Sequence, residues 1–99
     1  MSLVIEYAGP DLRLTGELDH AGVSRALIEA RPWLTSGQGP LRVDLGGVKR
    51  SESAGVALLL EWLRQAHRLD REIEFLNPPA QMRSLLKFFD LECVLTIRV

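Results

Sequence analysis

The sequence predicts a single α/β domain with a mixed, mostly parallel β-sheet covered by helices. Short apolar segments rich in β-branched residues alternate with longer segments whose apolar residues recur every three or four positions. Strands separated by helices need crossover connections, which join parallel strands. The first two strands are joined by a short turn, so one edge of the sheet should be antiparallel. The predicted order is β-β-α-β-α-β-α, with a further strand at the end.

Length and composition suit one domain spanning residues 1–99, with a core of its own. The chain is 46% hydrophobic and 25% charged, with 12 basic against 13 acidic residues. A net charge of −1 argues against nucleic-acid binding, which requires a basic face for the phosphates. No apolar run reaches the roughly 18 residues of a membrane span, and no leader pattern is present. A lone cysteine, Cys93, fits a reducing compartment and a small core residue, so we expect an intracellular domain without membrane insertion.

A hairpin is predicted at the start of the chain. The residues 3–7 are apolar and partly β-branched, and residues 12–15 alternate apolar with polar side chains. Gly9-Pro10-Asp11 between them is a turn signal. Gly16 is expected to end the second strand.

A helix should follow over about residues 21–34, with Asp19 or His20 as its N-cap. Its apolar positions are spaced three and four residues apart, as on one face of a helix. Pro32 is expected to bend this helix or end it early, because proline lacks the N–H that the helix needs. The composition of residues 36–40, Ser-Gly-Gln-Gly-Pro, indicates a loop.

The middle of the chain predicts a strand, a loop and a long helix. The strand covers residues 41–45 and is expected to end at Gly46-Gly47. After a short loop, Ser53 begins a helix that continues to about Arg68. Loops of this kind lie at the carboxyl ends of strands, where open α/β sheets usually bind their ligands.

The last third predicts a strand over residues 73–76, a helix and a final strand over residues 94–99. Pro78 and Pro79 should stop the first of these strands and start the helix, because proline suits the first helical turn. The helix carries apolar residues at helical spacing between positions 82 and 89.

The start of the helix at Ser53 has features of a contact site. Ser53 is suited to be the N-cap, and Glu52 just ahead of it meets the positive end of the helix dipole. The small residues Ala54 and Gly55 would let another molecule approach the helix backbone closely. Alternatively, Gly55 only makes room for the neighbouring strand.

The same helix has an unusually wide apolar arc. Its core stripe is extended by Leu58 and Trp62 to roughly 200°, wider than the roughly 100° that packing on one sheet requires. Either these two side chains lie under a neighbouring helix, or they form a hydrophobic patch that docks a partner.

Several segments, in this order along the chain, together resemble the STAS domain (sulfate transporter and anti-sigma factor antagonist). They are Leu12-Arg13-Leu14-Thr15-Gly16-Glu17-Leu18-Asp19, Val43-Asp44-Leu45, Glu52-Ser53-Ala54-Gly55-Val56-Ala57-Leu58-Leu59, Ile73-Glu74-Phe75-Leu76-Asn77-Pro78-Pro79 and Leu85-Leu86-Lys87-Phe88-Phe89-Asp90-Leu91. Each segment is weakly specific alone, but the set covers nearly the whole chain. The resemblance implies a STAS-like fold.

The resemblance also implies a site. In phosphoregulated members of the family, a kinase modifies the second of two hydroxyl positions before the helix, and that position is Ala54 here. Glu52 stands where the family has aspartate, and Ser53 holds the first hydroxyl. The missing acceptor at Ala54 argues against the ordinary phospho-switch.

A bare STAS domain of this kind is similar to the small cytoplasmic subunit of Mla-type ABC phospholipid transporters, which maintain outer-membrane lipid asymmetry. This similarity implies a non-catalytic subunit that binds the transporter's cytoplasmic ATPase and lies at the inner membrane through that partner. It implies that Glu52, Ser53, Ala54 and Gly55 make the contact, with Leu58 and Trp62 beside them. The alternative is an anti-sigma factor antagonist controlled by a serine kinase, for which Ser53 is the remaining acceptor.

Other functions have little support in the sequence. The two histidines, His20 and His67, lie in different predicted elements, so we expect no catalytic site. Neither a metal-ligand cluster nor a phosphate-binding glycine motif is present, so no cofactor is expected. Arg71 and the arginines before it lie among acidic residues and are interpreted as a solvated face. An enzyme or ligand sensor would need a pocket that nothing in the sequence marks.

Overall fold

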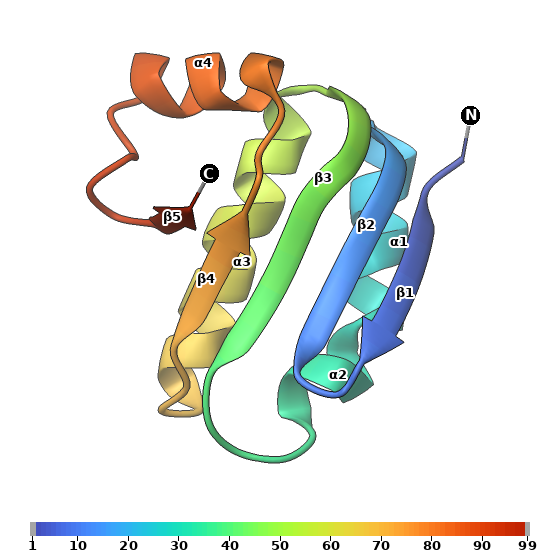
Figure 1. The fold of residues 1–99 in the computed structure, drawn as a ribbon, viewed down its shortest axis with the longest axis vertical. Coiled ribbons are helices and arrows are strands. Elements are labelled where there is room, and N and C mark those ends of the chain that lie inside the picture. Colours follow the sequence, from blue (N-terminus) through green and yellow to red (C-terminus); the bar gives the residue numbers. More distant parts are fainter. Residues whose placement is uncertain (1, 99) are drawn as a thin grey trace.

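A five-stranded mixed sheet organises the chain. The computed structural model describes residues 2–98, and the strands follow the sheet order β1-β2-β3-β4-β5 (Figure 1). Only the β1–β2 pair is antiparallel; the other pairs are parallel. The strands are β1 (Val4–Ala8), β2 (Asp11–Leu18), β3 (Leu41–Ser51), β4 (Ile73–Leu76) and β5 (Thr96–Arg98). The predicted fold class and element order are confirmed.

Three helices pack on one face of this sheet, and a fourth lies across the end at which β3 finishes (Figure 1). The β2–β3 and β3–β4 crossovers advance across the sheet in the same direction, and right-handed crossovers that do so place their helices on the same face. The helices are α1 (His20–Glu29), α2 (Arg31–Thr35), α3 (Ser53–Arg68) and α4 (Ala80–Phe88).

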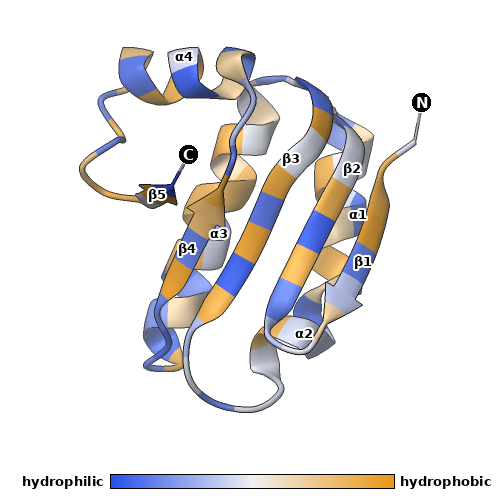
Figure 2. Cartoon of the chain, viewed as in Figure 1, coloured by the Kyte–Doolittle hydropathy of each residue, from blue (hydrophilic) through white to orange (hydrophobic). Residues whose placement is uncertain are grey.

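The other face of the sheet is open and carries paired charges. Polar residues alternate with apolar ones along β2, β3 and β4, so hydrophilic stripes cross the ribbon in Figure 2. Oppositely charged side chains meet across neighbouring strands, as expected for a solvated sheet face. The pairs are Arg13–Asp44 at 3.1 Å, Arg42–Asp11 at 2.9 Å and Arg98–Glu74 at 2.8 Å.

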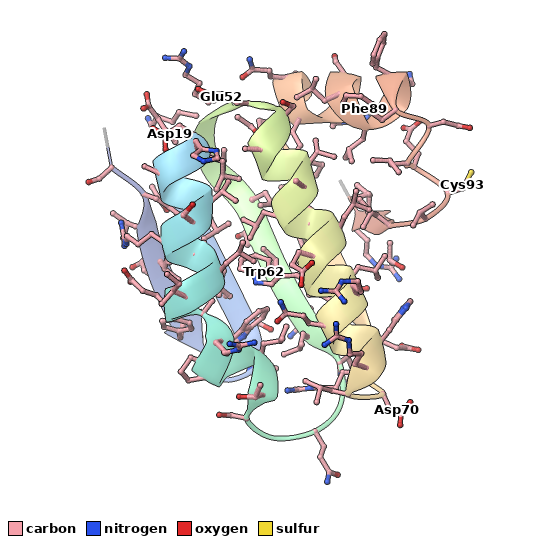
Figure 3. All side chains as sticks on the ribbon, turned by 180° about the vertical axis from the view of Figure 1, so that it is seen from behind. Asp19, Glu52, Trp62, Asp70, Phe89 and Cys93 are labelled. Carbon is pink, nitrogen blue, oxygen red and sulfur yellow. The ribbon has the colours of Figure 1, made fainter. Side chains whose placement is uncertain are left out.

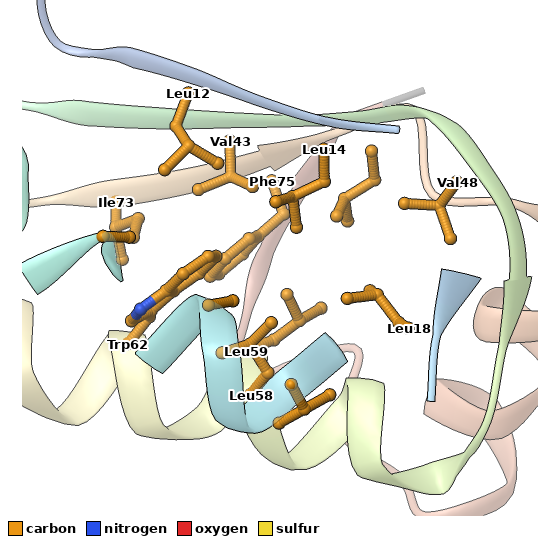
Figure 4. Close-up of a cluster of buried hydrophobic side chains, with 14 of the residues drawn as sticks. Leu12, Leu14, Leu18, Val43, Val48, Leu58, Leu59, Trp62, Ile73 and Phe75 are labelled. Carbon is orange, nitrogen blue, oxygen red and sulfur yellow. The ribbon is translucent and has the colours of Figure 1, made fainter. Parts of the chain in front are cut away.

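The hydrophobic core lies between the sheet and α1, α2 and α3 (Figure 4). Trp62 of α3 is among its largest fully buried side chains. The Trp62 ring meets Trp33 of α2 edge to face, with 5.6 Å between the ring centroids. Such aromatic pairs contribute beyond the area that they bury. The short helix α2 therefore covers the far end of α3.

Two predicted strand ends are wrong, because the glycines do not stop the strands. β2 continues through Gly16 to Leu18, and β3 continues through Gly46-Gly47 to Ser51. The β2–β3 register shifts twice in this stretch, as at β-bulges. A Cβ on Gly47 would lie 2.6 Å from the Thr15 hydroxyl oxygen, so this glycine lets the two strands approach.

The helix predicted over residues 21–34 is two helices. Of the two predicted candidates, Asp19 is the N-cap of α1: its Oδ1 accepts a hydrogen bond from the Gly22 N–H at 2.8 Å. α1 ends at Glu29, and Pro32 lies in the first turn of α2, where its missing N–H costs little. Pro32 thus ends the first helix, as its chemistry predicts.

The C-terminal segment departs from expectation in three respects. The final strand is only Thr96–Arg98, and residue 99 of the predicted strand lies outside the described residues. Cys93 is exposed instead of buried, because the chain between α4 and β5 runs along the surface (Figure 3). The prolines do stop β4, but Pro79 is the N-cap of α4 and does not lie in its first turn.

Replacing Trp62 by alanine tests the core. We expect Trp62→Ala to lower the free energy of unfolding by about 3–5 kcal/mol, because it opens a cavity and removes the partner of Trp33. Ile28→Ala, at a residue 75% exposed on α1, should change it by less than about 0.5 kcal/mol. Urea unfolding of both variants makes the comparison; similar losses would contradict the packing.

Candidate functional site

The starts of α1 and α3 lie at the same end of the molecule, near Asp19 and Glu52 (Figure 3). β2 leads directly into α1, and β3 leads directly into α3. The Glu52 N–H donates a hydrogen bond to the Leu18 carbonyl oxygen at 3.2 Å, which ties the two connections together. The carboxyl ends of parallel strands therefore form one surface here, at the usual ligand-binding edge of an open α/β sheet.

Ser51 and Gln81 hold the start of α3 in place from its buried side. Ser51 is fully buried, and its Oγ donates a hydrogen bond to the Glu52 carbonyl oxygen at 3.1 Å. The Ser51 N–H donates to Gln81 Oε1 at 3.1 Å, which joins α4 to the end of β3. The sequence analysis missed both residues. A strand that ends at Gly46-Gly47 would leave Ser51 in a loop, and no local pattern marks Gln81.

Gly55 is a packing residue. It is buried, and a Cβ at this position would overlap Ser51 Oγ and lie 3.3 Å from both Leu18 Cβ and Met82 Cε. Of the two interpretations left open by the sequence, the structure supports the one in which glycine makes room for the neighbouring strand. Gly55 allows the first turn of α3 to pack closely on the residues beneath it.

Ser53 is not the N-cap of α3, contrary to prediction. Glu52 holds that position, with an extended backbone (φ −89°, ψ 176°), and no side chain of residues 2–98 caps the helix. The reason is the length of β3: the strand runs to Ser51, so only Glu52 remains to link it to the helix. Ser53 is instead the first helical residue. Its side chain is exposed, as is Glu52, while Ala54 is half-buried.

Leu58 and Trp62 do not form an exposed patch, and the prediction that they contact a partner is corrected. They are 0% and 1% exposed, respectively, because α1 and α2 cover this side of α3. The wide apolar arc therefore serves two packing surfaces, the sheet and the neighbouring helices. On the outer face of α3, Glu61 accepts hydrogen bonds from Arg64 at 2.6 Å and Gln65 at 2.7 Å. These bonds lower the pKa of the Glu61 carboxyl, first through Arg64.

The surface around Ser53 carries charges of both signs. Lys49 and Arg50 are exposed near the end of β3 and form no ion pair within residues 2–98. They adjoin the positive end of the α3 dipole, and Glu52 supplies a negative charge. This arrangement offers hydrogen-bond donors and charge to another surface.

The structure does not bring the two histidines together. His20 opens α1 and His67 lies in the last turn of α3, at opposite ends of the molecule (Figure 1). Within the described chain, no three His, Cys, Asp or Glu side chains gather in a group suited to a metal ion. Across residues 2–98, no helix has the length and apolar character to cross a membrane.

A double-mutant cycle tests the packing at Gly55. We expect Gly55→Ala to lower the free energy of unfolding by about 1–3 kcal/mol through overpacking, although alanine is the better helix former by about 1 kcal/mol. In a Ser51→Ala background the loss should shrink by at least about 0.5 kcal/mol, because the overlapping hydroxyl is gone. Urea unfolding measures all four proteins. Stabilisation by Gly55→Ala would contradict the close approach.

Comparison with solved structures shows the same fold. The unphosphorylated anti-sigma factor antagonist SpoIIAA is 22% identical, with a TM-score of 0.77 over 98% of this chain and 88% of that chain. The Bacillus cell fate determinant SpoIIAA in its phosphorylated form is 21% identical, with a TM-score of 0.70 over 98% and 91%. A STAS domain protein from Planctomyces limnophilus is 10% identical, with a TM-score of 0.74 over 99% and 90%. At these identities the likeness concerns the fold alone.

No curated protein sequence matches the chain. A family model described as "Mlab, STAS domain" matches residues 1–96, which is nearly the full length. The order of strands and helices and the helix start at Ser53 agree with the resemblance seen in the sequence. The protein therefore belongs to the STAS domain family that this model describes.

Proposed function

We propose that this protein is a non-catalytic interaction subunit whose α3 start binds the cytoplasmic ATPase of an ABC-type phospholipid transporter. In this role it supports the ATPase, contributes to outer-membrane lipid asymmetry and lies at the inner membrane through its partner. The observation that carries the proposal is the exposed first turn of α3, where Glu52 and Ser53 face outward beside the half-buried Ala54. STAS domains typically serve as non-catalytic modules for protein–protein interaction.

The physical case rests on small side chains over a fixed backbone. Ser53 and Ala54 leave the helix backbone accessible, and no side chain in the described part of the chain caps its first N–H groups. Ser51 and Gln81 hold this turn in place, so little conformational entropy is lost when a partner binds. A rigid helix start with free donors favours an acceptor-bearing partner surface.

Two observations support a transporter ATPase as the partner. The matching family model carries the Mlab description. Ala54 has no hydroxyl at the position where the phosphoregulated members that this chain resembles carry the modified serine.

A second candidate function is that of an anti-sigma factor antagonist regulated by a serine kinase. It is favoured by the likeness in fold to SpoIIAA and by Ser53 itself. The Ser53 side chain is exposed and does not cap the helix, so its hydroxyl is accessible to a kinase.

Affinity capture with Ser53→Arg tests the proposed contact. The wild-type chain should retain an ABC-type ATPase from membrane extract, as identified by mass spectrometry. The arginine should weaken binding by about 30-fold or more, because its long side chain blocks the helix start. Unfolding free energy should change by less than about 0.5 kcal/mol, because the residue is exposed and caps nothing.

Gln38→Arg is the matched control, since it adds the same charge at an exposed loop residue at the other end of the molecule. This variant should retain the ATPase like the wild type. Equal retention by Ser53→Arg would show that the helix start is not the contact.

A kinase assay distinguishes the second candidate. Wild type and Ser53→Ala are incubated with ATP and serine-kinase fractions of the source cell, and intact masses are measured. The transporter proposal expects no phosphate on either protein. A single phosphate on the wild type that Ser53→Ala does not acquire would favour the antagonist function instead.

A further inference from the structure

Arg71 is a buried cation without a carboxylate partner. It lies between α3 and β4 and is only 6% exposed. Its Nε donates a hydrogen bond to the Gly39 carbonyl oxygen at 2.8 Å, and its Nη1 donates to the carbonyl oxygens of Leu34 at 2.9 Å and Ser36 at 2.7 Å. Within residues 2–98 no acidic side chain forms an ion pair with it. Arginines this deeply buried are normally paired with an anion.

The third nitrogen of the guanidinium, Nη2, is free to bind. It makes no hydrogen bond in the described chain, where every fully buried side-chain nitrogen or oxygen has a partner. Nη2 is therefore in contact with solvent. Arg71 lines two hollows, a smaller one beside Leu69 and Asp70 and a larger one whose walls are aromatic. The larger hollow is open, has a volume of about 680 Å³ and lies between the β1–β2 turn, α2 and the loop that follows it. This volume is within the range of about 300–1,000 Å³ that is typical of small-molecule sites.

The walls of the hollow are largely formed by side-chain rings. The polar atoms of the tyrosine and tryptophan among them already form hydrogen bonds within the protein. The walls include Tyr7, Pro10, Pro32 and Trp33. The Trp33 Nε1–H donates to the Pro10 carbonyl oxygen at 3.1 Å. The Tyr7 hydroxyl donates to the carbonyl oxygen of Glu29 at 3.2 Å. Burial, and secondly the Glu29 charge, raise the pKa of Tyr7, so its hydroxyl stays neutral at physiological pH.

The net charge lining the hollow favours an anion. Within the described chain, Glu29 is the only acidic side chain that lines the hollow. Its charge is neutralised by Arg25, whose Nε lies 2.7 Å from Glu29 Oε2. Arg71 therefore contributes a positive charge that no acidic side chain balances, beside walls made of apolar side-chain rings. A carboxylate on a small aromatic body matches both features, because charge-assisted hydrogen bonds to arginine are strong and rings pack on Tyr, Trp and Pro.

We propose that this hollow binds a small aromatic carboxylate, whose carboxylate accepts a hydrogen bond from Arg71 Nη2 and whose ring packs between Tyr7 and Trp33. The hollow is lined by residues of α2 and the β1–β2 turn. These two segments lie at the end of the molecule opposite the start of α3 (Figure 1). The site is therefore independent of the proposed partner contact, and either can fail alone.

Titration of the isotope-labelled chain with phenylacetate, followed by NMR, tests the site. The Arg71 Nε–H and Trp33 Nε1–H signals should shift and saturate, while the Ser53 amide, at the other end of the molecule, stays unchanged. Phenylacetamide has the same shape without the charge and should bind at least about 10-fold more weakly. Equal shifts with both compounds, or no saturable shift with phenylacetate, would overturn the proposal.

Tyr7→Ala keeps Arg71 and its loop contacts but removes one wall. We expect it to weaken phenylacetate binding by about fivefold or more, the loss of one ring contact. Val4→Ala is the matched control, because Val4 and Tyr7 lie on the same strand and are each 49% exposed. If Tyr7→Ala binds as well as Val4→Ala, the ligand does not lie in this hollow.

Discussion

At the start of α3, the helix lies so close to the ends of β2 and β3 that position 55 has no room for a side chain. A Cβ there would overlap Ser51 Oγ and crowd Leu18 and Met82. Three elements, β2, β3 and α4, thus meet under one helical turn, and the hydrogen bond from Ser51 to Gln81 closes the arrangement. This close packing holds the turn in place, because a shift of its residues would disturb the buried side chains beneath them.

The two ends of the molecule have different physical characters. At the carboxyl ends of β2 and β3, small and polar side chains lie over a fixed backbone, which suits contact with a protein surface. At the opposite end, the chain turns through Ser36–Gly39 around the buried guanidinium of Arg71. There the packing leaves an open hollow with aromatic walls. The core, which includes Trp62, lies between the two ends.

The sequence predicted the architecture because strand and helix periods are local properties of the chain. It located the helix start at Ser53 and narrowed the cap of α1 to Asp19 or His20 for the same reason. It failed where the answer depends on tertiary neighbours. Gly47 looks like a strand end until Thr15 is known to face it, and the burial of Trp62 depends on where α2 lies. Arg71 looked like one charge on a solvated face, whereas its bonds to three carbonyl oxygens are invisible in any local pattern.

The proposed partner contact at the start of α3 can be measured directly. Hydrogen–deuterium exchange of the chain, alone and with the purified transporter ATPase, measures this contact without any substitution. We expect slower exchange in the peptides covering residues 49–55, and unchanged exchange in the peptide covering residues 36–40. Protection confined to residues 36–40, or no change at residues 49–55 in a complex that does form, would contradict the proposed contact.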